Sequence, residues 1–107
     1  MTKKLNKWLA DRSVTEVECL VPDIAGIPRG KILPAEKYDK VLQGSDLRLP
    51  EYVFGQTVTG DYHDSVVLNA AVGDVVLKPD ENAAFLVPWY SEPTAQIIHD
   101  AYYLDNK

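Results

Sequence analysis

The residues whose types could do chemistry form one short polar stretch and one distant histidine. Asp61, His63 and Asp64 lie close together, and His99 follows far along the chain. Carboxylate and imidazole groups bind divalent metals, but these three neighbours lack the helical or turn spacing of known ligand sets. His99 alternates with apolar residues, which favours a hydrogen-bonded core or edge histidine over a catalytic base. We therefore expect solvated charge in the polar stretch and no metal site.

The other reactive groups do not assemble into a site either. Cys19 is the single cysteine, which excludes a disulfide within the chain. It falls on the apolar side of an alternating stretch, so we expect a buried small hydrophobe and not a catalytic thiolate. Gly55 and Gly60 lack the lysine and the strand–glycine–helix context of a phosphate loop. The residues alone predict no catalytic, cofactor-binding or metal-binding side chain.

A hairpin over residues 14–34 is the element around which we expect the rest to be arranged. Its first arm alternates apolar residues with glutamates, as a half-buried strand does: Val17, Cys19 and Val21 against Glu16 and Glu18. Proline, aspartate and glycine residues over 22–28 predict a turn. The return arm carries Arg29 and Lys31, which we expect beside the two glutamates on the outer side.

Two short helices are expected to pack against this hairpin. One lies within residues 3–12, where Trp8 should dock on the domain edge, and the other spans residues 34–43 and should lie across the sheet. Their apolar stripes are Leu5, Trp8 and Leu9 in the first helix and Tyr38, Val41 and Leu42 in the second.

Further strands follow the second helix. Residues 47–50 look irregular, and residues 79–82 read as a turn between two strands. The expected strands are a brief one over 52–54, one over 74–78, a return strand over 83–87 and a last one over 94–103. This order predicts an α+β fold of the β-grasp type, a small mixed sheet with one helix packed across it plus a short N-terminal helix.

Length and charge limit the domain organisation and the partners. The chain has 107 residues and a net charge of −5. This length fits a helix over 1–13, a β-grasp domain over 14–104 and a tail over 105–107. An acidic chain without a basic stripe argues against nucleic acid and anionic membranes as partners. Because no apolar run approaches the ~20 residues that cross a bilayer, and the N-terminus lacks a signal-peptide core, we expect a cytoplasmic protein.

Four separated segments, in order, resemble the N-terminal domain of the glutamine synthetase superfamily. They read VECLVPDIAGIPRGKILP, LPEYVF and QTVTGDY on either side of Gly55, DVVLKPD, and VPWYSEPTAQIIHDAY. The likeness runs over residues 14–104 and is greatest for the glutamate–putrescine ligase (γ-glutamylpolyamine synthetase) branch. Four motifs in the right order are more specific than any one of them.

The resemblance implies a part of a ligase. In that family a β-grasp domain precedes a larger catalytic domain, which holds ATP, glutamate and the ligands of magnesium or manganese. The chain ends about where that domain would begin, so we expect no cofactor in this fragment, and ATP and Mg or Mn in a full-length enzyme. The implied partners are the C-terminal catalytic domain and neighbouring subunits of a ring oligomer, whose amine site this domain helps to close.

The resemblance also implies a substrate-amine loop. Where ammonia-using members carry an Asp-Gly-Ser-Ser motif, this chain has Phe54-Gly55-Gln56-Thr57. A phenyl ring cannot attract ammonium, whereas an apolar wall suits the methylene chain of a polyamine, whose far ammonium Asp61 would meet. In the other interpretation, which stays open, Phe54 is core and Asp61 is a solvated charge. The loop residues implied are Phe54, Gln56, Thr57, Asp61 and Tyr62.

Two functions of different classes fit the sequence. The first is the N-terminal domain of an ATP-dependent glutamate–amine ligase, inactive as a fragment because the nucleotide and metal ligands lie elsewhere. The second is a free-standing β-grasp module for binding or assembly without a catalytic role, because the sheet edge of a small domain can add a partner strand.

Overall fold

The hairpin expected near the start of the chain is present. The computed structural model describes residues 2–22, 26–50 and 74–103, and in it β1 (Glu16–Pro22) pairs antiparallel with β2 (Pro28–Pro34). The alternation places Val17 and Cys19 in the core, with no exposed surface. At Gly30 a Cβ atom would overlap the Cys19 carbonyl oxygen of the neighbouring strand, so a glycine is needed at this position.

The register of the hairpin differs from the expectation for its charged residues. Lys31 lies opposite Cys19 and Arg29 opposite Val21, whereas Glu18 lies opposite Ile32. Directly opposite residues in an antiparallel pair share a face, so neither cation lies beside the glutamates. The prediction was wrong because the length of the connection decides which residues share a face, and one residue more or less exchanges them.

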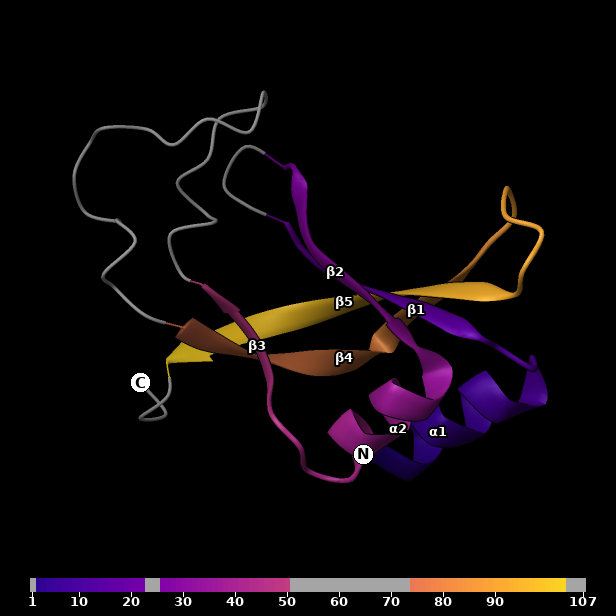
Figure 1. Ribbon diagram of the computed structural model, residues 1–107, viewed down its shortest axis with the longest axis horizontal. Helices are drawn as coiled ribbons and strands as arrows, with labels where there is room; N and C mark the ends of the chain where they lie inside the picture. Colours follow the sequence, from indigo (N-terminus) through magenta and orange to yellow (C-terminus); the bar gives the residue numbers. More distant parts are fainter. Residues whose placement is uncertain (1, 23–25, 51–73, 104–107) are drawn as a thin grey trace.

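The described strands form one mixed sheet in the order β2-β1-β5-β4-β3 (Figure 1). The last three are β3 (Leu47–Pro50), β4 (Asp74–Val87) and β5 (Thr94–Tyr103). β5 runs parallel to β1 and antiparallel to β4, so the last strand of the chain lies in the centre of the sheet. In this position β5 pairs in parallel with β1, although the two strands lie far apart in the sequence.

The segment between Asp74 and Val87 is one long strand, not the two strands and a turn expected from its sequence. Both halves pair with β5, and the register shifts between Pro79 and Ala84. The Asn82 N–H donates to the Asp80 carboxylate at 2.9 Å, so the turn residues make a local turn-like bond without reversing the chain. They lie where the register of β4 against β5 shifts within one continuous strand. The expectation of two antiparallel partner strands here was wrong.

The stretch expected to be irregular, Leu47 to Pro50, is the edge strand β3. Leu47 and Leu49 are buried, and they lie opposite Leu77 and Val75 of β4. Two alternating leucines give too short a pattern for recognition from sequence. Pro50 closes the strand, as a proline is tolerated at a sheet edge because no ladder donor is needed there.

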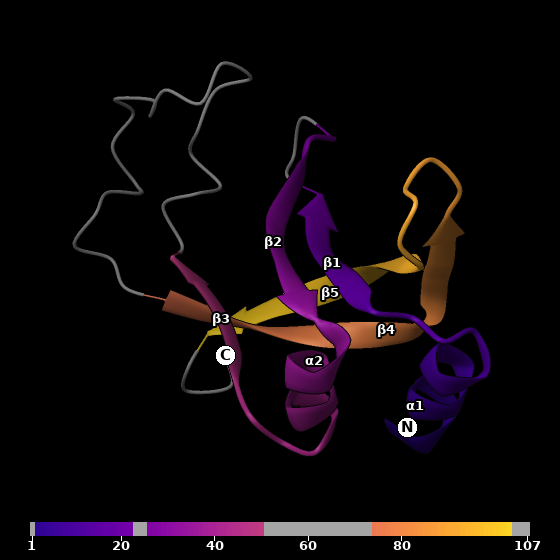
Figure 2. The same cartoon turned by 45° about the vertical axis from the view of Figure 1, so that its right-hand side comes forward.

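Both described helices, α1 (Thr2–Asp11) and α2 (Ala35–Leu42), lie on the same face of the sheet (Figures 1 and 2). Trp8 is half-buried against the core, as expected, and the Arg12 guanidinium lies 4.4 Å from the centre of its ring. Neither helix has the length and apolar composition to cross a membrane. The main buried side chains between helices and sheet are Leu5, Leu9, Tyr38, Leu42, Val17, Cys19, Leu77 and Ile97.

The opposite side of the sheet, here called the outer face, carries no helix of the described residues (Figure 2). Ile32, Phe85 and Tyr102 are 58%, 55% and 40% exposed. The register places all three on this face, because they pair with Glu18, Gln96 and Val76. The predicted α+β class is confirmed: the molecule is a β-grasp-like mixed sheet, and both helices of the described residues lie on one face of it.

Candidate functional site

The substrate-amine loop implied by the resemblance lies outside the described residues. This applies to Phe54, Gln56, Thr57, Asp61 and Tyr62, to the strand expected over 52–54, and to His63 and Asp64. The fold does position the two ends of that connection, since Pro50 at the end of β3 pairs with Asp74 at the start of β4. Both ends therefore meet at one edge of the sheet.

His99 lies in the core, which is one of the two positions, core or sheet edge, that its alternation with apolar residues predicts. It is 2% exposed, and its Nδ1 lies 2.9 Å from the Ile97 carbonyl oxygen while its Nε2 lies 2.8 Å from the Tyr38 hydroxyl. A neutral ring with its proton on Nδ1 satisfies both contacts, because Nδ1–H donates to the carbonyl and Nε2 accepts from the hydroxyl. The hydrogen bond joins α2 to β5.

Burial keeps this ring uncharged at neutral pH. Desolvation lowers the pKa of His99 to about 4, against the opposing effects of the Ile97 and Leu20 carbonyls and of Asp100. Burial, with a smaller effect of Cys19, raises the pKa of Tyr38 well above its usual range. These groups act as hydrogen-bonding partners within the core and are not placed for acid–base chemistry on a ligand.

Cys19 belongs to the same hydrophobic core, and burial raises the pKa of its thiol to about 12, with Lys31 as a smaller opposing charge. A thiol in this environment stays protonated and unreactive at neutral pH. The expectation of a structural cysteine is confirmed. Because His99, Tyr38 and Cys19 are buried, a ligand can more readily reach the charged and aromatic side chains of the outer face.

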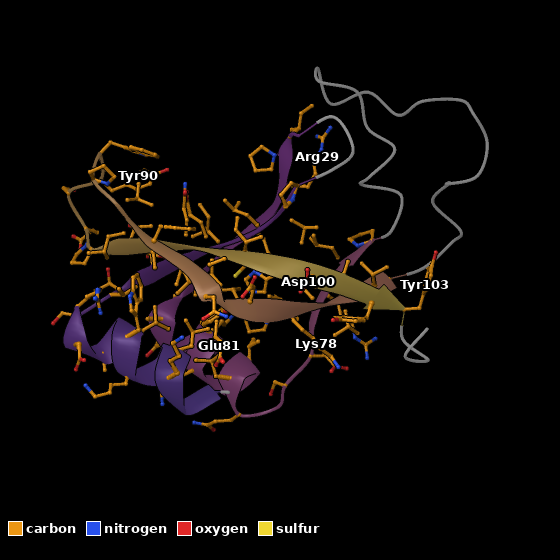
Figure 3. The ribbon with its side chains drawn as sticks, turned by 180° about the vertical axis from the view of Figure 1, so that it is seen from behind. Arg29, Lys78, Glu81, Tyr90, Asp100 and Tyr103 are labelled. Carbon is orange, nitrogen blue, oxygen red and sulfur yellow. The ribbon has the colours of Figure 1, made fainter. Side chains whose placement is uncertain are left out.

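Glu18 is the centre of a polar network on the outer face. It is only 9% exposed, although no described helix covers this side. Its Oε2 accepts from the Tyr90 hydroxyl at 3.0 Å, and its Oε1 accepts from the Gln96 amide at 2.8 Å. Both donors are uncharged, so the carboxylate is held in a fixed orientation without neutralisation by these two partners. Figure 3 shows Tyr90 on the side of the sheet away from the helices.

A cavity of about 250 Å³ lies beside this network and is here called the outer-face pocket. Three glutamates from two elements surround it, and apolar atoms of Ile32 and Tyr90 contribute to its wall. Among the described residues, no three His, Cys, Asp or Glu side chains converge as metal ligands. The pocket can therefore surround an apolar stem and a cation, but it contains no nucleophile paired with a base. Its lining is Glu16, Glu18, Ile32, Tyr90, Ser91, Glu92 and Thr94.

Sequence reasoning missed this network for a physical reason. Glu18 and Tyr90 are 72 residues apart, and the parallel pairing of β1 with β5 brings the β4–β5 connection next to Glu18. The alternation of Glu16 and Glu18 with apolar residues predicts their face but not their partners. No local signal could have identified Tyr90 as the donor.

Comparisons with known proteins find similar structures but no similar sequence. No family model and no curated protein matches the chain. GmaS in a complex with ADP has a TM-score of 0.69 and 15% identity over 97% of this chain, and GmaS without ligand has 0.70 and 14% over 95%. A novel glutamine synthase homolog has a TM-score of 0.72 and 22% identity over 88% of this chain.

The match accounts for a small part of those proteins. It covers 21% of each GmaS chain and 22% of the glutamine synthase homolog, so this chain spans about a fifth of their length. At 14–22% identity the likeness establishes the fold alone. The chain has the fold found in the N-terminal region of glutamine synthetase homologues.

Proposed function

We propose that this chain is the N-terminal domain of an ATP-dependent glutamate–amine ligase of the glutamine synthetase type. The observation that carries the proposal is the fold match, which covers nearly all of this chain but only about a fifth of each larger protein. One of those proteins is described as a complex with ADP and another as a glutamine synthase homolog, which supports a nucleotide-dependent ligase.

The role of the domain in this proposal is to shape an amine site that other residues complete. The described part has a buried neutral His99 and a buried Cys19 thiol, so its reactive groups are unsuited to bond making. ATP and the magnesium or manganese ions would be held by a catalytic domain. The loop containing Phe54 and Asp61 would face the amine site of a neighbouring subunit in a ring.

The proposed amine is a polyamine, and the loop residues give the reason. Phe54 supplies an apolar wall for a methylene chain, and Asp61 supplies a carboxylate for the far ammonium, with Gln56, Thr57 and Tyr62 alongside. Ammonia needs the carboxylate that Phe54 replaces. Replacing the phenyl ring with a carboxylate should therefore favour ammonia over putrescine.

The test is a kinetic comparison of amines on the enzyme encoded by the full reading frame. ADP release is followed with glutamate plus putrescine, spermidine or ammonia. We expect kcat/KM to be highest for a polyamine and Phe54→Asp to lower that value at least about tenfold, which is about 1.4 kcal/mol. Lys37→Ala, on the exposed side of α2, is the matched control and should leave kcat/KM unchanged for polyamine and for ammonia. Ammonia as the best substrate of the wild type would reject the polyamine branch.

A second function is favoured by one observation, the outer face without a helix among the described residues. A free-standing module would use that face to bind a separate chain and would have no ligase activity. The reading frame after Lys107 distinguishes the two: a stop codon there favours the module, and a catalytic domain favours the ligase. In both cases the 107-residue chain alone should release no ADP from ATP with glutamate present.

A further inference from the structure

We propose that the outer face is a docking surface for a protein segment that places a lysine or arginine side chain in the outer-face pocket. The inference goes beyond the proposed function, because it concerns the described sheet and not the amine loop. It also holds for either of the two functions above, since each requires a protein partner.

The face that the described helices leave uncovered carries exposed apolar surface. Ile32 and Phe85 are more than half exposed, and they lie at the two ends of one row across the sheet, Ile32–Glu18–Gln96–Phe85. The next row pairs Leu20 with Ile98, both half-buried. Apolar side chains gathered on one face, with polar groups among them, are typical of a protein-binding surface.

The negative charge around the pocket indicates the sign of the occupant. Glu16, Glu18 and Glu92 surround the pocket, and the chain as a whole carries −5. The Glu18 carboxylate is fixed by two uncharged donors, so its charge is available to a cation entering from outside. A partner with an acidic or phosphate group here would meet like charges, whereas a basic side chain is attracted.

The size and lining of the pocket match a long basic side chain. Its volume of about 250 Å³ and the apolar atoms of Ile32 and Tyr90 suit the aliphatic stem of a long side chain. Lysine and arginine bury such stems along apolar surface while the charged head stays near carboxylates or water. The apolar rows beside the pocket then contact the neighbouring residues of the same segment.

A second copy of the chain is a poorer occupant. A two-fold contact centred on the pocket would bring Glu16 and Glu92 of one copy against the same residues of the other. Like charges facing each other oppose association. The surface is therefore better matched to a basic segment of a different sequence than to itself.

The test uses two short peptides as probes, acetyl-Val-Leu-Lys-Leu-Val-amide and its counterpart with norleucine in place of lysine. Each is titrated into the 107-residue chain while backbone amide chemical shifts are recorded. We expect saturable shifts at Glu18, Ile32 and Phe85 with the lysine peptide, a Kd of about 1 mM, and weaker binding at high salt. Equal shifts with the norleucine peptide, or no saturable shift up to about 10 mM, would overturn the proposal.

Variants locate the effect on the outer face. Glu92→Gln should raise the Kd of the lysine peptide about threefold, because it removes one charge at the exposed rim of the pocket. It should leave the Kd of the norleucine peptide unchanged. Glu36→Gln, exposed on α2 on the other side of the sheet, is the matched control and should leave both unchanged. If both variants weakened binding of the lysine peptide equally, the binding would depend only on the net charge of the chain, which would contradict a specific site. Sedimentation equilibrium that finds a dimer abolished by Phe85→Asp would assign the face to a second copy instead.

Discussion

Acid should destabilise this domain through one residue, His99, well before general acid unfolding. In the folded state burial lowers the pKa of His99 to about 4, whereas an unfolded histidine has its usual value of 6.5. Between about pH 6.5 and pH 4, His99 binds a proton in the unfolded state but not in the folded state. The stability attributable to the neutral ring is therefore complete above about pH 6.5 and declines as the pH falls toward 4.

The size of the loss follows from the two pKa values. With 6.5 for the unfolded state and about 4 for the folded state, the free energy of unfolding falls by about 1 kcal/mol at pH 6, about 2 at pH 5 and about 3 at pH 4. Solvent screening is small because the side chain is 2% exposed and its Nε2 accepts from Tyr38 inside the core. A small domain has only about 5–15 kcal/mol of stability, so this loss is a large fraction.

The assay compares the wild type with His99→Gln by urea unfolding, followed by circular dichroism between about pH 7 and pH 4. Glutamine can accept from the Tyr38 hydroxyl but does not titrate, so carboxylates common to both proteins cancel in the difference. We expect the stability difference, wild type minus variant, to fall by about 3 kcal/mol over this range. A difference that stays constant with pH would refute the assignment of a buried, neutral histidine.

The buried contacts of Tyr38, Gly30 and Cys19 should each be measurable in solution. Tyr38→Phe should lower the free energy of unfolding in urea at neutral pH by about 1–3 kcal/mol, because Nε2 of the buried His99 loses its donor. Tyr102→Phe, on the exposed end of β5, should leave the free energy of unfolding almost unchanged. Gly30→Ala should lower the free energy of unfolding by about 3 kcal/mol or prevent folding, because the new Cβ would overlap the Cys19 carbonyl oxygen. Soluble yield and thermal unfolding measure this loss of stability. A melting temperature equal to that of the wild type would contradict the prediction. The Cys19 thiol, with a pKa of about 12, should not react with a disulfide reagent at about pH 8 until urea unfolds the chain, and fast labelling of the folded protein would show that the strand is open.

The elements predicted from the sequence were those whose pattern is local. The alternation around Cys19 and the stripe containing Tyr38 each indicate one buried face, and both occur as expected. His99 could be assigned to the core for the same reason, since it continues the apolar alternation of β5. A period of two or 3.6 residues is enough to predict burial, although it does not identify the partner.

What the sequence did not predict depends on long-range pairing. Residues 79–82 have the composition of a turn, but β5 provides one continuous partner for both halves of β4, so the turn residues produce a register shift and not a reversal of the chain. The register of β1 and β2 depends on the connection between Pro22 and Pro28, and it moved Lys31 to the opposite side from Glu18. The loop with Phe54 and Asp61 lies outside the described residues, so its role stays a prediction.

The two faces of the sheet treat polar groups differently, and this difference is the strongest structural reason to expect a partner. On the helix side, Tyr38 and His99 are buried as a neutral pair that satisfies itself within the core. On the outer face, Glu18 is 9% exposed, and its carboxylate, held by Tyr90 and Gln96, lies beside an open pocket and the exposed Ile32 and Phe85. The two uncharged donors orient this carboxylate before any partner arrives, but they do not neutralise it. A basic side chain that enters the pocket would therefore gain a charge-assisted contact with little reorganisation of the domain.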